Sequence, residues 1–149
     1  MKNFLSLLFL FFSLTIIGQN FTRQDSLRGS ITPEREWWDL KKYQLNVEVD
    51  LENKTIKGDN TINYTVLEKN NSMQIDLQPP MKIVKVIQDG KELNVKHEGN
   101  AHFIQFEKKQ KKGSNYKVTI FFSGKPPTTL NAPWDGGFSW SKDSNGKHF

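Results

Sequence analysis

Residues 43–66 read YQLNVEVDLENKTIKGDNTINYTV, and this stretch decides the predicted fold. In its first half, from Tyr43 to Leu51, apolar residues alternate with polar or charged ones. A period of two is typical of a β-strand with one buried face. A polar turn at residues 52–54 leads into a second alternating run over residues 56–66. The stretch therefore predicts two consecutive strands, the first of them half-buried.

Shorter apolar runs continue this pattern towards the C-terminus. They occupy residues 73–77, 83–87, 93–95, 103–106 and 116–122. The dipeptide Asp89-Gly90 between two of them indicates a tight hairpin, because both central residues of a type I′ turn need positive φ. Strands about ten residues apart, without helical periodicity, predict an all-β fold, namely an antiparallel β-sandwich. Residues 19–39 have no clear period and are expected to cross the sheet as an N-terminal arm.

The first 18 residues predict a signal peptide. A short basic start precedes an apolar run from Phe4 to Ile17. A membrane-spanning helix needs about 20 residues, so this run fits the apolar part of a secretory signal, and Gly18 supplies a small residue at the expected cleavage point. A membrane-anchoring or buried helix is the alternative. We expect residues 1–18 to be removed and residues 19–149 to form one partial β-sandwich domain. The protein is then secreted or periplasmic, with no stable membrane span.

The 149 residues include no cysteine and carry a formal net charge of +5. Without cysteine, a disulfide framework, a Cys-ligated zinc site, an iron–sulfur cluster and a thiol nucleophile are excluded. Nearly all positive charge comes from lysine, whereas arginine is the preferred residue for bidentate phosphate contacts, so we expect no nucleic-acid partner. The lysine-rich run at residues 108–112 is interpreted as a solvated loop, with binding to an anionic surface as the alternative.

His97 and His102 resemble a zinc motif only superficially. A metalloprotease helix places its histidines four residues apart on one face, whereas these two are five apart. An odd spacing on a strand sends side chains to opposite faces, and Gly99-Asn100 forms a turn between them. The sequence also contains no phosphate-binding loop and no nucleophile elbow. It therefore predicts no catalytic, substrate-binding or metal-ligating residue.

Aromatic residues gather in two places, at Trp37-Trp38 and in PWDGGFSW at residues 133–140. Stacking on a carbohydrate is one interpretation, but aromatic side chains more often bury area in a core or at an interface. Asn145-Gly146 predicts a further hairpin whose return strand would be missing. We therefore expect the aromatic residues to pack against a missing neighbour. The chain would be the first portion of a larger protein.

The order of these elements resembles the start of gluzincin zinc aminopeptidases, the aminopeptidase N family. The strand pair at residues 43–66, the strand at 73–77 and the Asp89-Gly90 hairpin carry this resemblance. The PWDGGF element at residues 133–138 is similar to the secreted bacterial branch of the family. The resemblance covers almost the whole chain after residue 22. It implies a saddle-like β-sandwich, incomplete at its C-terminus, that precedes a thermolysin-like catalytic domain.

The resemblance also implies a parent enzyme that hydrolyses peptides from their N-terminus. In such an enzyme zinc activates the attacking water and a glutamate acts as general base. The family motifs His-Glu-x-x-His and Gly-x-Met-Glu-Asn are absent from this sequence. We therefore expect an inactive amino-terminal scaffold that binds no zinc itself and docks to the catalytic domain, through which alone the peptide substrate is bound. The alternative is a free-standing secreted β-sandwich that binds a protein or carbohydrate partner.

Overall fold

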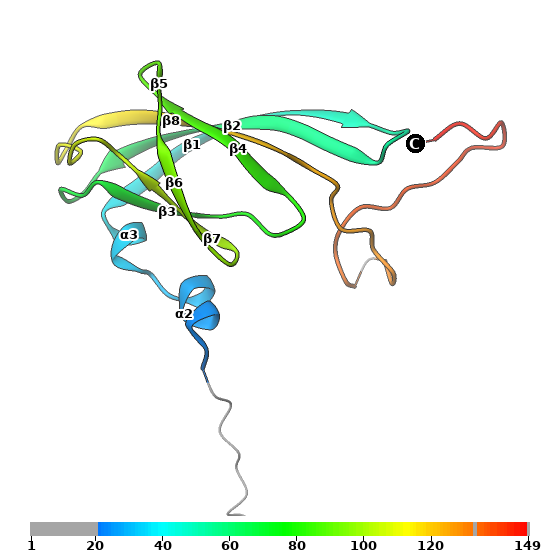
Figure 1. The fold of residues 1–149 in the computed structure, drawn as a ribbon, viewed down its shortest axis with the longest axis horizontal. Coiled ribbons are helices and arrows are strands. Elements are labelled where there is room, and N and C mark those ends of the chain that lie inside the picture. Colours follow the sequence, from blue (N-terminus) through cyan, green and yellow to red (C-terminus); the bar gives the residue numbers. More distant parts are fainter. Residues whose placement is uncertain (1–20, 133, 149) are drawn as a thin grey trace, which may run out of the picture.

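The computed structural model describes residues 21–132 and 134–148, so the expected signal peptide at residues 1–18 lies outside the described residues. Two antiparallel sheets build the fold (Figure 1). The larger sheet has the strand order β1-β2-β8-β4-β5, and the smaller has the order β3-β7-β6. The strands are β1 (Trp38–Asp50), β2 (Thr55–Val66), β3 (Ser72–Asp76), β4 (Lys82–Gln88), β5 (Lys91–Glu92), β6 (Asn94–Glu98), β7 (Ala101–Gln105) and β8 (Asn115–Gly124). The predicted all-β antiparallel fold is thereby confirmed.

Short polar turns set the register of the larger sheet. The carboxylate of Asp50 closes the turn between β1 and β2, because it accepts hydrogen bonds from the Asn53 backbone at 2.9 Å and from its side chain at 2.7 Å. Asp89 and Gly90 have φ values of 51° and 79°, as predicted for the turn between β4 and β5. β8 lies between β2 and β4 and completes the sheet.

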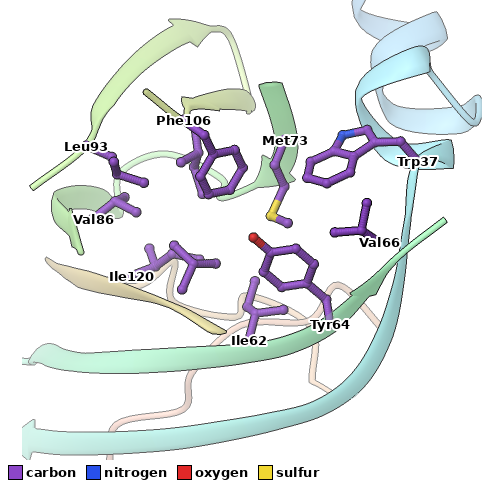
Figure 2. Packing of buried hydrophobic residues seen from close by; sticks show 11 residues of the cluster. Trp37, Ile62, Tyr64, Val66, Met73, Val86, Leu93, Phe106 and Ile120 are labelled. Atoms are coloured by element: carbon purple, nitrogen blue, oxygen red, sulfur yellow. The ribbon is translucent and has the colours of Figure 1, made fainter. Parts of the chain in front are cut away.

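The core lies between the two sheets and is centred on aromatic side chains (Figure 2). Trp37 is 1% exposed and meets Tyr64 and Phe106 edge to face, with ring centroids 6.0 and 5.9 Å away. The Tyr64 hydroxyl accepts a hydrogen bond from Gln88 Nε2 at 3.0 Å, and burial raises the pKa of Tyr64 above its ordinary value. Both sheets contribute the other buried apolar members, which are Ile62, Val66, Met73, Val86, Leu93, Ile104, Val118 and Ile120.

The N-terminal arm contains two short helices, α2 (Arg23–Gly29) and α3 (Pro33–Glu36). The sequence predicted an arm without a clear period here and did not indicate these two helices. A capping box between Thr22 and Asp25 begins α2, and the helix buries only Leu27, so it leaves no periodic pattern in the sequence.

The arm is held on β3, as expected, through Gln74. This buried side chain donates to the Leu27 carbonyl at 2.9 Å and accepts from the Thr32 hydroxyl at 2.7 Å. Neither helix, nor any other in the described part of the chain, is long and apolar enough to cross a membrane.

Candidate functional site

Half of the inner face of the larger sheet is uncovered. Tyr43 pairs directly with the buried Ile62, which places the alternating residues Tyr43, Leu45, Val47 and Val49 on the core-facing side of β1. These four side chains are nevertheless 46–61% exposed. The predicted alternation is confirmed, but the predicted burial of this strand was wrong. The smaller sheet covers the other end of the larger one, and the β1–β2 hairpin extends beyond it (Figure 1).

A hollow of about 610 Å³ lies where the covered half of this face gives way to the open half. Its walls are predominantly apolar and come from both sheets and from the loop between β3 and β4. They include Leu45, Ile56, Ile75, Leu77, Met81, Ile83 and Phe122. An apolar concave surface of this kind on a folded domain is typical of an interaction site. We call the hollow and the exposed β1 side chains next to it the apolar inner face.

One polar side chain in the wall of the hollow lacks a partner. The Oδ1 atom of Asn60 is buried and makes no hydrogen bond within the described residues. Asn60 lies in β2 opposite Leu45 and next to Ile120 of β8, so apolar residues flank it. Buried polar atoms are nearly always hydrogen-bonded, and an unpaired one costs about 1–3 kcal/mol. The inner face therefore presents an unpaired hydrogen-bond acceptor at this point.

The loop that contains Asp135 presents a second exposed apolar surface. The Asp135 carboxylate accepts hydrogen bonds from the Thr129 hydroxyl and from the backbone N–H groups of Leu130 and Asn131, the latter two at 2.6 and 2.8 Å. The Thr129 hydroxyl, followed by the two backbone groups, holds the pKa of Asp135 below its ordinary value. Leu130 and Trp134, both 88% exposed, lie on this ordered loop. Pro133 of the PWDGGFSW stretch lies outside the described residues.

The aromatic residues singled out in the sequence do not form one platform. Trp37 is buried in the chain's own core and donates from Nε1 to the Ser72 carbonyl at 2.7 Å, while Trp38 packs beside it and donates to the Glu34 carbonyl at 3.2 Å. For Trp37, packing against a missing neighbour was the wrong prediction, whereas Trp38 is half-buried and also lines the hollow. Phe138 and Trp140 stack on each other at 5.5 Å. Trp134 alone of the four tryptophans is fully open to a partner.

His97 and His102 face each other, contrary to the prediction of opposite faces. Gly99 and Asn100 reverse the chain within two residues, so His97 of β6 stands opposite His102 of β7. Their Nδ1 atoms are 2.6 Å apart, and His102 Nε2 is 3.0 Å from the Leu77 carbonyl. Because Nε2 donates to that carbonyl, His102 Nδ1 accepts the hydrogen from His97.

This histidine pair does not fit zinc. Two zinc-bound nitrogens each lie about 2.0–2.1 Å from the metal and about 3.3 Å apart in a tetrahedral site, and three protein ligands are the minimum seen in catalytic sites. The described residues contain no group of three or more potential metal ligands. The prediction assumed that residues an odd number of positions apart lie on one strand and point to opposite faces. Here the chain reverses at Gly99 and Asn100, so the two histidines lie on neighbouring strands.

The lysine-rich run at residues 108–112 has exposed lysines, and Lys112 forms an ion pair with Glu68. Its middle residue, Gln110, is instead buried beneath the loop, with Oε1 3.5 Å from the Tyr64 hydroxyl. The run is thus partly anchored to the core, and its lysines point to solvent. No sequence signal marked Gln110 as the anchor.

Residues 40–148 match the family model described as the peptidase M1 N-terminal domain. No curated protein sequence matches the chain. An M1 zinc metallopeptidase from Deinococcus radiodurans, solved with a Tyr-Ser-Ala substrate, is similar with a TM-score of 0.56 and 15% identity over 67% of this chain and 23% of that one. Native yeast LTA4 hydrolase has a TM-score of 0.50 and 19% identity over 59% of this chain and 14% of that one.

Proposed function

The chain belongs to the peptidase M1 N-terminal domain family, and from that membership we propose that it serves as the non-catalytic scaffold of a zinc metallo-aminopeptidase. The family match over residues 40–148 carries this proposal, and it does not support the alternative of a free-standing binding module. The chain spans about a quarter of the length of the solved metallopeptidases it resembles. The activity proposed here therefore belongs to a longer polypeptide.

The catalytic residues and the zinc belong to that longer polypeptide. The motifs expected of the family are absent from this sequence, and the only facing histidines use three of their four ring nitrogens on each other and on the Leu77 carbonyl. When bound in the parent, zinc would activate a water for attack on the N-terminal peptide bond. The residues of this chain contribute surface and support to that site.

The apolar inner face is the surface through which the scaffold would join the rest of its polypeptide. Tyr43, Leu45, Val47 and Val49 expose about half of their area, and covering apolar surface is worth about 25 cal/mol per Å². The occupant would also supply a donor for Asn60 Oδ1. The exposed side chains of Leu130 and Trp134, on the loop that Asp135 holds in place, would form a second contact with the rest of the polypeptide. Tryptophan is enriched among the residues that dominate the binding energy of interfaces.

Export is part of the same proposal. The basic start and the apolar run over residues 4–17 support a cleaved secretory signal and a secreted or periplasmic location. N-terminal sequencing of the protein recovered from its source tests this. A first residue of Gln19 or Asn20 supports export, and recovery of intact Met1 contradicts it.

The scaffold proposal is tested on the longest natural polypeptide that contains this chain. Its sequence should contain His-Glu-x-x-His beyond residue 149. It should hydrolyse aminoacyl-naphthylamides, and a metal chelator should stop this hydrolysis. Residues 1–149 by themselves should show no turnover. A gene without these motifs, or chelator-sensitive turnover by the 149-residue chain, would overturn the proposal.

Leu45→Asp and Gln44→Asp form a matched pair for the docking face, because neighbouring residues of a strand point to opposite sides. In the 149-residue chain, at a concentration low enough to keep it monomeric, neither substitution should lower the unfolding midpoint, since both positions are exposed. In the longer polypeptide Leu45→Asp should lower both the midpoint and the turnover, and Gln44→Asp should change neither. Equal behaviour of the two variants in the longer polypeptide would contradict docking through the inner face.

A further inference from the structure

The outer edge of β1 is a long unpaired strand edge. β1 comes first in the strand order and pairs with β2 alone among the described residues. Its other row of backbone N–H and C=O groups therefore faces outwards. Proteins commonly protect such edges with charged side chains (especially lysine), proline, a bulge, inward-pointing charges or a very short strand. β1 has Lys41 and Lys42 and a register shift between Leu40 and Lys42 near its start, but it has 13 residues and no proline, whereas the edge strand β5 has two residues.

We propose that this edge pairs with the β1 edge of a second copy of the chain, antiparallel about a two-fold axis through Leu45. In such a pair, a residue on one side of the axis faces the residue of the second copy that lies equally far on the other side. The side chains at these mirrored positions must therefore be compatible with one another. The stretch from Lys42 to Glu48 has this property. The proposal does not depend on the catalytic parent, because the hydrogen bonds of the pairing use the backbone edge of β1, although the side chains of Tyr43 and Leu45 also line the hollow.

The register about Leu45 matches both faces of the strand. On the polar face Lys42 of each copy stands opposite Glu48 of the other, so two opposite-charge pairs form. On the apolar face Leu45 meets its own copy, and Tyr43 meets Val47, an aromatic and β-branched pair. Cross-strand pairs of these kinds each contribute about 0.2–1 kcal/mol. Glu48 already pairs with Lys57 of β2 at 2.9 Å, and both side chains are mostly exposed, so a second cation at Glu48 fits.

Other registers satisfy the sequence less well. A slip of one residue sets apolar side chains opposite polar ones, which the period of two forbids. A two-fold axis through Gln44 sets Lys42 opposite Asn46 and Glu48 opposite Leu40, and so pairs no charges. An axis through Asn46 pairs Lys42 with Asp50 but leaves Glu48 opposite Gln44, away from any cation of the second copy. The axis through Leu45 is therefore the one that pairs Lys42 with Glu48 and the bulky apolar residues with one another.

Single cysteines test the register, because the chain contains none of its own. Residues directly opposite each other have Cα atoms about 4.5–5.5 Å apart, within the range of a disulfide. Leu45→Cys should therefore crosslink a dimer under mild oxidation. Val49→Cys lies on the same face of the same strand. In the proposed pairing the two copies of residue 49 are separated by eight residues along the strands, which is about 27 Å at 3.4 Å per residue. It should crosslink at least tenfold more slowly.

Light scattering over a concentration series gives the oligomeric state of the 149-residue chain, with a dimer expected. Lys42→Glu brings like charges together twice and should weaken the dimer about tenfold. Adding Glu48→Lys to it should restore most of the affinity, with unchanged thermal midpoints at a concentration where every variant is monomeric as the check on folding. A monomer at every concentration, equal crosslinking of the two cysteine variants, fastest crosslinking by Asn46→Cys, or no recovery in the double variant would overturn the proposal.

Discussion

Gly58 is the position where the smallest substitution should have the largest effect on the open half of the sheet. It lies in β2 between Val47 of β1 and Phe122 of β8. A Cβ atom at Gly58 would lie 2.0 Å from the Asn46 carbonyl oxygen and 3.1 Å from Phe122 Cζ. Since Cβ atoms do not approach other heavy atoms below 3.0 Å, Gly58→Ala must separate β1 and β2 by roughly 1 Å.

The free energy of this change follows from two opposing effects. Forced repacking typically costs about 1–3 kcal/mol, and backbone hydrogen bonds lost near Asn46 add about 1 kcal/mol each. The lower chain entropy of alanine in the unfolded state returns about 0.4–1 kcal/mol. The free energy of unfolding should thus fall by about 1–3 kcal/mol. Amide hydrogens of β1 near Asn46 should also exchange faster with solvent.

Urea unfolding measures this effect, and Gly29→Ala is its matched control. Nothing lies within 4 Å of a Cβ atom at Gly29, and the residue ends helix α2, so alanine there should leave stability unchanged or raise it by up to about 1 kcal/mol. If Gly58→Ala unfolds at the same urea concentration as Gly29→Ala, the close approach of the Asn46 carbonyl does not constrain the sheet and the reasoning is refuted.

Two further predictions concern the core and the Asp135 loop. Trp37→Ala should lower the free energy of unfolding by about 3–5 kcal/mol, whereas Trp134→Ala, at an exposed position, should leave it unchanged in the same urea titration. Equal losses would contradict the assignment of Trp37 to the core. Asp135 has a lowered folded-state pKa, so its stabilising bonds are complete above the ordinary value of 3.8 and are lost as the pH falls through the lowered one. The amide NMR signals of Leu130 and Asn131 should therefore move only in strong acid, and a transition near neutral pH would argue against the carboxylate.

The strands and hairpins could be predicted because their signals are local. Alternation marks each strand, and the positive φ values of Asp89 and Gly90 follow from the turn type that their dipeptide favours. Helix α2 was missed because a capping box and one buried residue produce no period. The pairing of His97 with His102 was missed for a different reason. Across a two-residue turn, partners are set by their distance from the turn, and both histidines stand two positions from it.

The candidate site was harder to predict than the fold, because alternation shows which residues share a face and not whether anything covers them. Leu45 and Ile62 lie on the same face of the larger sheet, yet Leu45 is 61% exposed and Ile62 is 2% exposed. For the same reason the sequence could not distinguish the buried Trp37 from the exposed Trp134. Both are aromatic residues in irregular segments, and only tertiary packing makes the first a core residue and the second a surface residue.

β2 shows how one strand can serve both folding and assembly. Its C-terminal half carries Ile62, Tyr64 and Val66. These side chains are buried against the smaller sheet and form part of the domain's own core. Its N-terminal half carries Ile56, Gly58 and Asn60 on the same face, where the smaller sheet no longer covers them. A chain that folds around the first half can keep the second half open without losing its core, because the two halves share only the backbone ladder. The uncovered half is therefore where an occupant can bind without refolding the domain, and Asn60, polar and unpaired at the boundary, marks where its contacts would begin.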